Sequence, residues 1–451
     1  MKSASDRSGD AVSVREKVCY AMGDASANIA WRGIAAFLFI FYTDVFGLDP
    51  AAVGLLMLVA RIGDGVTDVL MGVVADRTST RWGKFRPWIL WSALPLGVIL
   101  SLTFTCPTSF GPSGRLAYAY VTYIAFTLAY TAMSIPYGAL MSVMSPDDRV
   151  RTSIGSYKMV GAFAGGMVVQ GLLPVLRVRF DSYSTPIYLL SAVMVILMPL
   201  AFFGTKERVA PPKGQDGSLA ADLRDLVRNF PWGVLLLVAL LFNLYNSVKQ
   251  GVTIIYFTHY LGREILCASY MTALMLASVA GAWATTPLAF RFGKRRLFVA
   301  SLVLSGILCA GLWFCGPTDL VPVFVLGVAS EFFAAILPTL CFGMLGDVAD
   351  YSEWRNGRRA TGLVYSATSF AMKFGGGAAG LVIGLILARY GYDAKSAEGV
   401  ARAFPGIRML MSWVPAIVAV ATAFAMAFYP ITEKKMKQIA DDLGARRKRS
   451  S

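Results

Sequence analysis

Two acids, Asp64 and Asp68, and a base, Arg61, interrupt the apolar stretch ARIGDGVTDVLMG at residues 59–71. The acids are four residues apart, so in a helix both carboxylates project from one face. Each charge at membrane depth costs about 2.5–3.5 kcal/mol on the insertion scale, and neighbouring acids also repel each other. The pair therefore needs a positive partner. The sequence offers Arg61 and Lys373, and a bound sodium ion or protons would serve equally.

This acidic pair has two interpretations. In the first, Arg61 and Lys373 pair with the acids and only hold helices together. In the second, the acids bind a coupling cation, which we favour because ionisable groups in membranes usually mark an ion pathway. A hard cation prefers oxygen ligands, which Asp64, Asp68 and the Thr131 hydroxyl would supply. Lys373 would then compete with the cation.

The elements that position these residues are membrane spans. The chain has 451 residues, of which 56% are hydrophobic and 15% charged, and its mean hydropathy is +0.59. A helix needs roughly 20 apolar residues to cross a bilayer, and long continuous runs favour helices over a barrel. We predict an all-α membrane protein with twelve spans, at residues 23–46, 52–75, 87–106, 116–144, 153–176, 186–204, 232–260, 268–290, 297–314, 320–345, 360–388 and 408–430.

Basic residues predict the orientation of the chain. Most Lys and Arg residues outside the spans fall in the two tails and in every second connection. Such segments stay in the cytoplasm, so both termini are expected there. The net charge of +15 combines this signal with attraction to anionic lipid. Nucleic-acid binding is the weaker interpretation of the terminal ARRKRS.

Repeated motifs divide the chain into two halves. FYTDVFG at residues 41–47 matches YFTHYLG at 256–262, and RWGKFRPW at 81–88 matches RFGKRRLF at 291–298. Two parallel six-helix repeats with a long central loop describe the major facilitator fold. The expected domains are a cytoplasmic tail (1–19), an N-terminal half (20–204), a cytoplasmic connector (205–231), a C-terminal half (232–430) and a basic cytoplasmic tail (431–451).

Other kinds of site find little support. The six cysteines form no CxxC pair, and a single histidine, His259, makes neither a zinc site nor a catalytic triad. The run FGGGAAG at 374–380 lacks the Lys-Ser or Lys-Thr of a phosphate loop. We therefore expect no enzyme, no nucleotide site and no cofactor besides a coupling Na⁺ or H⁺.

Several motifs together resemble one family. They are YAMGDASANIAW (20–31), FYTDVFGL (41–48), ARIGDGVTDVLMG (59–71), ADRTSTRWGKFRPWIL (75–90), SIPYGAL (134–140), GDVADYSEW (346–354) and AMKFGGGAAG (371–380). As a set, they resemble the glycoside, pentoside and hexuronide:cation symporter family, which includes the melibiose permease and the glucuronide carrier. The resemblance implies a monomer in a bacterial inner membrane and a sugar substrate. It also implies a cation site at Asp64, Asp68, Thr131 and Lys373.

The substrate site departs from the melibiose permease pattern. Asn28 and Ser134 stand where that permease has acids, and Lys158 stands where it has an arginine. Two further cations, Arg32 and Lys249, lie inside predicted spans, where they could receive the carboxylate of a hexuronide. The alternative is that Glu331 or Asp24 neutralises them. The candidate substrate residues are Asp24, Asn28, Trp31, Arg32, Ser134, Lys158 and Lys249.

Charges at the predicted cytoplasmic ends resemble gating motifs. The resemblance is to the facilitator loop whose ion pairs form and break as the halves move, although solvated charges without this role are the alternative. The candidate gating residues are Asp76, Arg77, Arg81, Lys84 and Arg86 in the first half and Asp347, Asp350 and Glu353 in the second.

The sequence therefore predicts a secondary transporter that couples cation entry to sugar uptake by alternating access. Among glycosides, pentosides and hexuronides, an anionic uronide is slightly favoured because of Arg32 and Lys249. A sodium-coupled lysolipid carrier on the same fold is the alternative. A membrane sensor is a further one, which the short tails disfavour.

Overall fold

The computed structural model describes residues 12–107, 109–145, 148–208, 229–356 and 361–450. These residues form helices joined by short loops, and no strand occurs among them. The N-terminal half contains α1 (Val14–Ile40), the π-helical η2 (Phe41–Val45), α2 (Pro50–Arg77), α3 (Arg86–Thr103), α4 (Pro112–Met144), α5 (Asp148–Phe180) and α6 (Ser184–Gly204). The C-terminal half contains α8 (Phe230–Ile255), the π-helical η3 (Tyr256–Tyr260), α9 (Glu264–Phe292), α10 (Lys294–Gly311), the 3₁₀ turn η4 (Leu312–Phe314), α11 (Leu320–Asn356), α12 (Thr361–Arg389), α13 (Ala397–Met411), α14 (Trp413–Ala427) and α15 (Glu433–Ser450).

The prediction of an all-α membrane protein is confirmed. Eleven described segments are helical, long and apolar enough to cross a membrane. The helix α2 is not among these eleven, although its 28 residues give it the length of a span. It carries the charges of Arg61, Asp64 and Asp68. The count of twelve spans therefore stays a prediction.

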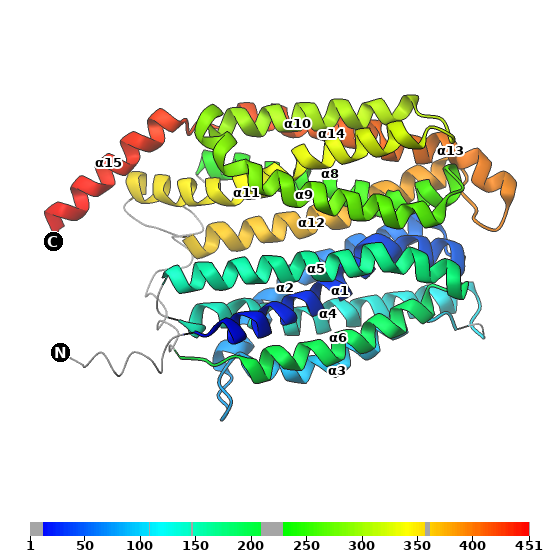
Figure 1. Ribbon diagram of the computed structural model, residues 1–451, viewed down its shortest axis with the longest axis horizontal. Helices are drawn as coiled ribbons and strands as arrows, with labels where there is room; N and C mark the ends of the chain where they lie inside the picture. The colour runs from blue at the N-terminus through cyan, green and yellow to red at the C-terminus, as the bar shows by residue number, and fades with distance from the viewer. Residues whose placement is uncertain (1–11, 108, 146–147, 209–228, 357–360, 451) are drawn as a thin grey trace.

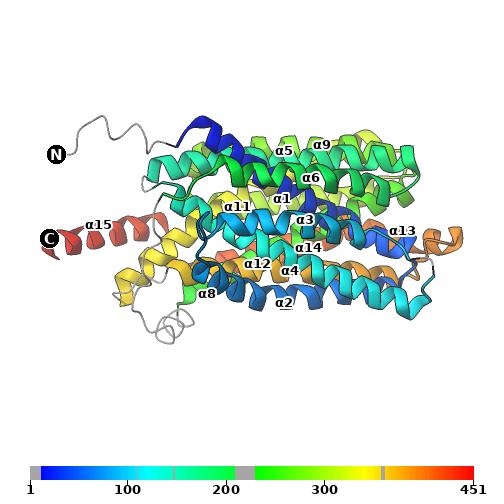
Figure 2. The same cartoon turned by 90° about the horizontal axis from the view of Figure 1, so that it is seen from below.

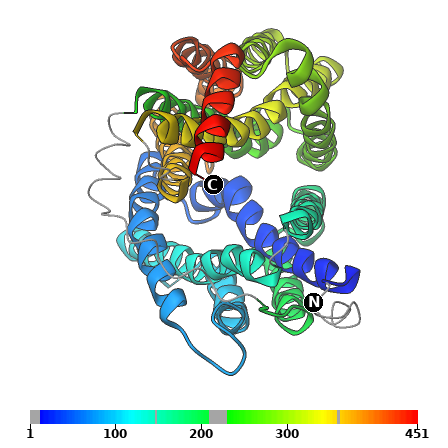
Figure 3. The ribbon, with the colours of Figure 1, turned by 90° about the vertical axis from the view of Figure 1, so that its left-hand side faces the viewer.

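The helices form two groups that meet along a shared face. Figure 3, which looks along the bundle, shows α1–α6 as one group and α8–α14 as the other. Between the groups, α2 packs against α12 and α5 packs against α9. Glycines allow the first of these contacts: a Cβ atom on Gly54 would lie 2.6 Å from the carbonyl oxygen of Gly380. Small residues of this kind bring membrane helices together closely.

The two ends of the bundle differ in what they carry. The beginning of α1 and the whole of α15 lie at one end, here called the inner end (Figures 1 and 2). The segments η2, η3 and α13 lie at the opposite end, here called the outer end. The beginning of α1 and the C-terminal helix are therefore on the same side of the bundle.

The first helix begins earlier than the first predicted span. The span was expected from residue 23, whereas α1 begins at Val14. The Ser13 hydroxyl accepts a hydrogen bond from the Glu16 backbone, and the Glu16 carboxylate accepts one from the Ser13 backbone. This reciprocal cap starts the helix, whereas hydropathy detects only its apolar part.

The last predicted span, 408–430, also begins too late. Its helix starts at Ala397 and continues through a break at Ser412, since α13 and α14 together form one apolar segment. Arg408, the first residue of the predicted span, lies inside α13, and its guanidinium lies 4.5 Å from the centre of the Trp313 ring and donates to the Trp313 carbonyl. Of the predicted connector, residues 209–228 lie outside the described residues.

Candidate functional site

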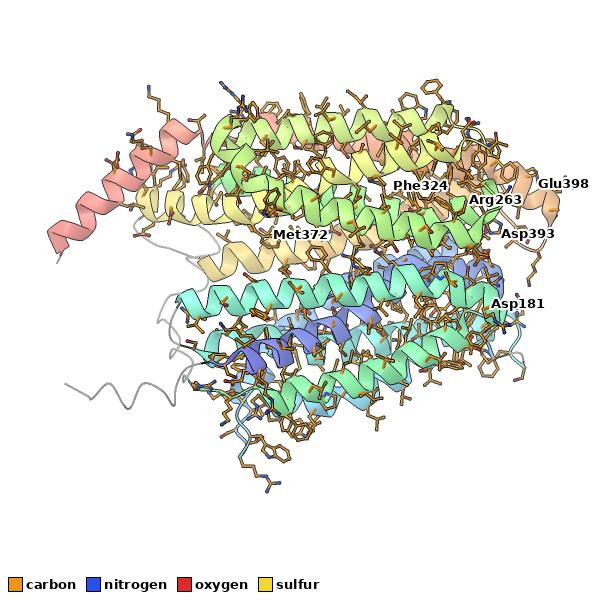
Figure 4. The ribbon with its side chains drawn as sticks, in the orientation of Figure 1. Asp181, Arg263, Phe324, Met372, Asp393 and Glu398 are labelled. Atoms are coloured by element: carbon orange, nitrogen blue, oxygen red, sulfur yellow. The ribbon has the colours of Figure 1, made fainter. Side chains whose placement is uncertain are left out.

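A cavity of about 800 Å³ lies between the halves and is lined by residues from both. Met372 of α12, labelled in Figure 4, is one of these residues and lies away from both ends of the bundle. The polar and charged side chains that line the cavity are Asn28, Trp31, Arg32, Arg61, Tyr123, Gln170, Asn243, Asn246, Ser247, Lys249, Gln250, Thr253, Ser278, Glu331, Thr339, Ser369 and Lys373.

Asp64 is neutralised within its own helix. Its Oδ2 accepts a hydrogen bond from Arg61 Nη1 at 2.8 Å, and the residue is only 3% exposed. Arg61 Nη2 also donates to the Tyr123 hydroxyl at 3.1 Å, and the guanidinium lies 4.3 Å from the centre of the Trp31 ring. Arg61 is therefore fixed by α1 and α4 as well as by Asp64. Trp31, one of the candidate substrate residues, therefore contacts this arginine from the cavity wall.

Asp68 contacts two of the other candidate cation residues, Thr131 and Lys373. Thr131 Oγ1 of α4 donates to Asp68 Oδ1 at 3.0 Å, and Lys373 of α12 forms an ion pair with Asp68 Oδ2. Arg61 and Lys373 line the cavity, whereas within the described residues neither acid is part of the lining. A cation that entered from the cavity would therefore have to displace Lys373 before it reached Asp68.

Lys249 is paired rather than free. Its ammonium donates to Tyr245 at 3.3 Å, to Ser330 at 3.0 Å and to Glu331 at 3.1 Å, and the residue is 4% exposed. An ammonium has three donors, so all of them are used. Ser278 donates to the other oxygen of Glu331 at 2.8 Å. The alternative in which Glu331 neutralises Lys249 is the one that the structure shows.

Arg32 differs from the other cations of the cavity. Its Nε is enclosed without a hydrogen-bond partner, and no ion pair links it to any residue that the structure describes. Asp24 lies instead near Lys158, at 3.9 Å, and accepts a hydrogen bond from Asn28 at 3.2 Å. Arg32 also lines the cavity, where Glu331 acts on it electrostatically.

Only some of the candidate substrate residues line the cavity. Asn28, Trp31, Arg32 and Lys249 belong to it, whereas Asp24, Ser134 and Lys158 do not. Sequence reasoning missed an apolar part of the wall. Its methionines are Met57, Met159, Met271, Met275 and Met372. No sequence signal distinguishes them, because a methionine that faces a cavity and one that packs in a core have the same hydropathy.

Charges at the inner end make contacts within each half. Glu207 accepts hydrogen bonds from the backbone of Lys84, Phe85 and Arg86 at 2.8–2.9 Å, which caps the beginning of α3. Lys294 forms an ion pair with Asp347 at 2.7 Å. These contacts organise the helix ends and leave the gating role a prediction.

The other candidate gating residues lie at the same helix ends. Arg81 stacks over Trp82 at 4.7 Å, and Arg77 is exposed at the end of α2. Asp350 and Glu353 follow Asp347 on α11. The side chain of Asp76 lies outside the described residues.

Comparisons with known proteins agree with this architecture. Residues 19–433 match the family model described as MFS/sugar transport protein. The chain is 34% identical to the inner membrane symporter YicJ of Escherichia coli, over 98% of this chain and 97% of that protein. It is 32% identical to the isoprimeverose transporter of Lactiplantibacillus pentosus, over 94% of this chain and 90% of that protein.

Similarity to solved structures concerns the fold alone. The nucleoside transporter NupG superposes with a TM-score of 0.67 at 13% identity, over 92% of this chain and 99% of that chain. Both the family and these relatives are transporters, a class without enzymatic activity, as the sequence predicted. The chain belongs to the MFS/sugar transport protein family.

Proposed function

We propose that this protein is a cation-coupled sugar symporter that works by alternating access. The observation that carries the proposal is the ion pair between Asp68 and Lys373, which joins the two halves beside the cavity. A cation on Asp68 and an ammonium at the same carboxylate exclude each other by charge and by space. Binding of the cation therefore changes a contact between the halves.

The coupling follows from the free energy of this pair. Removal of one partner from a buried ion pair leaves an uncompensated charge, which is strongly unfavourable. A sodium ion or proton would compensate Asp68, with oxygens of Asp68, Thr131 and, after movement of Arg61, Asp64 as ligands for sodium. Lys373 would then be released toward the cavity. A solute that contacts Lys373 or the surrounding polar groups would bind best after the cation.

The substrate class follows from the cavity lining. Asn243, Asn246 and Gln250 of α8 supply amide groups for sugar hydroxyls. Arg32 lines the cavity and forms no ion pair among the residues that the structure describes, and its planar fork fits a carboxylate or sulfonate, so an anionic sugar remains slightly favoured. Lys249 does not contribute, because its donors are used. Similar proteins of Escherichia coli are named a glucuronide carrier protein homolog, 29% identical, and a putative sulfoquinovose importer, 29% identical.

A lysolipid is the second candidate solute. The methionines of the wall form an adaptable apolar surface that would accept an alkyl chain as well as the apolar part of a glycoside. The polar side chains of α8 and the relatives favour the sugar.

The remaining features of the proposal concern location. We place the protein as a multi-pass monomer in a bacterial inner membrane, with the inner end and both termini in the cytoplasm. The basic residues of the inner loops support this orientation. The beginning of α1 and the whole of α15 lie at the same end of the bundle.

Uptake into right-side-out membrane vesicles tests the function. Labelled D-glucuronate, methyl β-D-xyloside and lysophosphatidylcholine would each be offered with an inward sodium gradient, an inward proton gradient or neither. We expect a sugar to accumulate only with one of the gradients. Equilibration without accumulation under both gradients would refute coupling, and accumulation of the lysolipid alone would refute the sugar assignment.

A further inference from the structure

A cluster of three side chains joins the halves at the outer end. Asp44 of η2 and His259 of η3 approach to 2.7 Å between Oδ2 and Nε2. The hydroxyl of Tyr392, which follows α12, donates to Asp44 Oδ1 at 2.7 Å and lies 2.9 Å from His259 Nε2. Thr43 donates to the same Asp44 oxygen at 2.7 Å. The Asp44 carboxylate is therefore held by groups from both halves.

Asp44 and His259 occupy equivalent positions of the repeat. Asp44 is the fourth residue of FYTDVFG and His259 the fourth residue of YFTHYLG, 215 residues later. Both motifs form π-helical segments, η2 and η3, and such segments often mark functional positions in helices. The repeat thus places an acid and a base opposite each other where the halves meet.

The surroundings of His259 identify which groups influence its charge. Asp44 and Tyr392 contact it directly, and Glu264 at the start of α9 acts on it electrostatically. Arg177 lies 3.8 Å from Glu264 and 3.0 Å from Asp181, so it offsets these two acids. Asp44 and Glu264 also act electrostatically on the buried Tyr183. Burial and then the Asp44 carboxylate raise the pKa of Tyr392 far above its usual value, so its hydroxyl stays protonated and keeps donating.

We propose that Asp44, His259 and Tyr392 form a proton-binding latch, the outer latch, which holds the outer ends of the halves together and weakens as the pH rises. Histidine is the side-chain type whose charge ordinarily changes between pH 5 and 8, and the chain has only one. With a charged imidazole the contact to Asp44 is a charge-assisted hydrogen bond, roughly twice as strong as a neutral one.

The direction of the effect follows from the charges. The side chains of Asp44 and His259 are 16% and 14% exposed, so a proton can reach them from the outer side. When the imidazole loses its charge, the hydrogen bond remains but the ionic attraction is lost, and Asp44 keeps an uncompensated charge. The outer end should therefore open more often at high pH than at low pH, by about fivefold.

Double electron–electron resonance, which measures the distance between two spin labels, tests the latch without a known solute. Spin labels would be attached at Arg179→Cys, an exposed position in the last turn of α5, and at Glu398→Cys, an exposed position labelled at the outer end of the other half in Figure 4. The two partly exposed cysteines, Cys19 and Cys106, would be replaced by alanine. The full-length protein in lipid nanodiscs would be measured at pH 5.5 and at pH 8.5.

We expect the long-distance population to grow about fivefold at the higher pH. His259→Gln keeps an N–H donor but cannot be charged, so it should show the larger open population at both pH values. Tyr392→Phe, a second variant, should raise the open population at pH 5.5. Glu264→Gln is the control, and its response to pH should remain.

Two results would overturn the latch. One is a distance distribution of the unsubstituted cluster that does not change with pH. The other is a pH response that persists in His259→Gln. Neither result bears on whether a cation gradient drives sugar uptake, so failure of the latch is distinguishable from failure of the proposed symport.

Discussion

Lys373 of α12 forms an ion pair with Asp68 of α2 across an interval of 305 residues. The two side chains come from different halves, and each is about one-fifth exposed. Thr131 holds the other oxygen of Asp68 in place. In the proposed transport cycle, this contact would link the movement of the halves to the charge state of the Asp68 carboxylate.

Asp68→Asn should abolish gradient-driven accumulation. The amide still fills the space beside Thr131 and Lys373 but carries no charge to attract a cation. We expect accumulation to fall at least tenfold, whereas exchange of solute across the membrane persists. Vesicle uptake with and without a cation gradient measures both. Asp49→Asn, at the exposed N-cap of α2, is the control, and equal losses in the two variants would contradict the cation-site assignment.

Arg32→Gln should weaken anionic sugars selectively. A hydrogen bond to a charged group contributes about 1.5–3 kcal/mol, so the affinity for a uronide should fall by about tenfold or more, and that for a neutral glycoside much less. Competition against uptake of each solute measures the ratio. The matched control is Lys158→Gln, which removes a cation that lies near Asp24 and is not part of the cavity lining. If Arg32→Gln weakened the binding of charged and neutral sugars equally, Arg32 would not be the residue that recognises the carboxylate.

Lys249→Met should reduce stability without changing selectivity. The ammonium neutralises Glu331 and uses all its donors on protein groups, so its loss leaves a buried carboxylate unpaired. The double variant Lys249→Met/Glu331→Gln should recover much of the thermal stability, with a coupling of about 1–3 kcal/mol. Thermal unfolding in detergent measures this. Additive losses would mean that the pair is not coupled.

The roles of Lys249 and Arg32 show where sequence reasoning reaches its limit. Hydropathy and charge placed both cations in membrane spans, and the spacing of Asp64 and Asp68 indicated an ionic site on α2. The sequence could not show which lysine donor meets which acceptor, because that depends on helix rotation and rotamers. Arg61 illustrates the same point, since it pairs with Asp64 alone while Lys373 pairs with Asp68.

Helix boundaries failed for a related reason. Hydropathy follows the preference for lipid, so it missed the polar first turns of α1 and shortened the last span at Arg408. In α1 the cap at Ser13 decides where the helix begins. Arg408 is accommodated in α13 because its guanidinium stacks on the Trp313 ring and donates to the Trp313 carbonyl. Both effects depend on local contacts that a window of average hydropathy does not contain.

Gly54→Ala should impair both stability and coupled uptake, although alanine is the better helix former. A methyl group there would lie 2.6 Å from the Gly380 carbonyl oxygen and 2.9 Å from the Leu381 Cα, both backbone atoms. The α2–α12 contact must therefore widen, and these helices carry Asp68 and Lys373.

The matched control lies on the same helix. At Gly72 an added Cβ would meet no atom within 4 Å, so Gly72→Ala should stabilise by about 0.5–1 kcal/mol through the backbone entropy of glycine. Thermal unfolding and gradient-driven uptake would be compared for the two variants. Because both changes add the same methyl group to the same helix, a difference between them reports only on the approach to α12. If Gly54→Ala matched Gly72→Ala in both measurements, close packing of α2 against α12 would not be needed to bring Asp68 to Lys373.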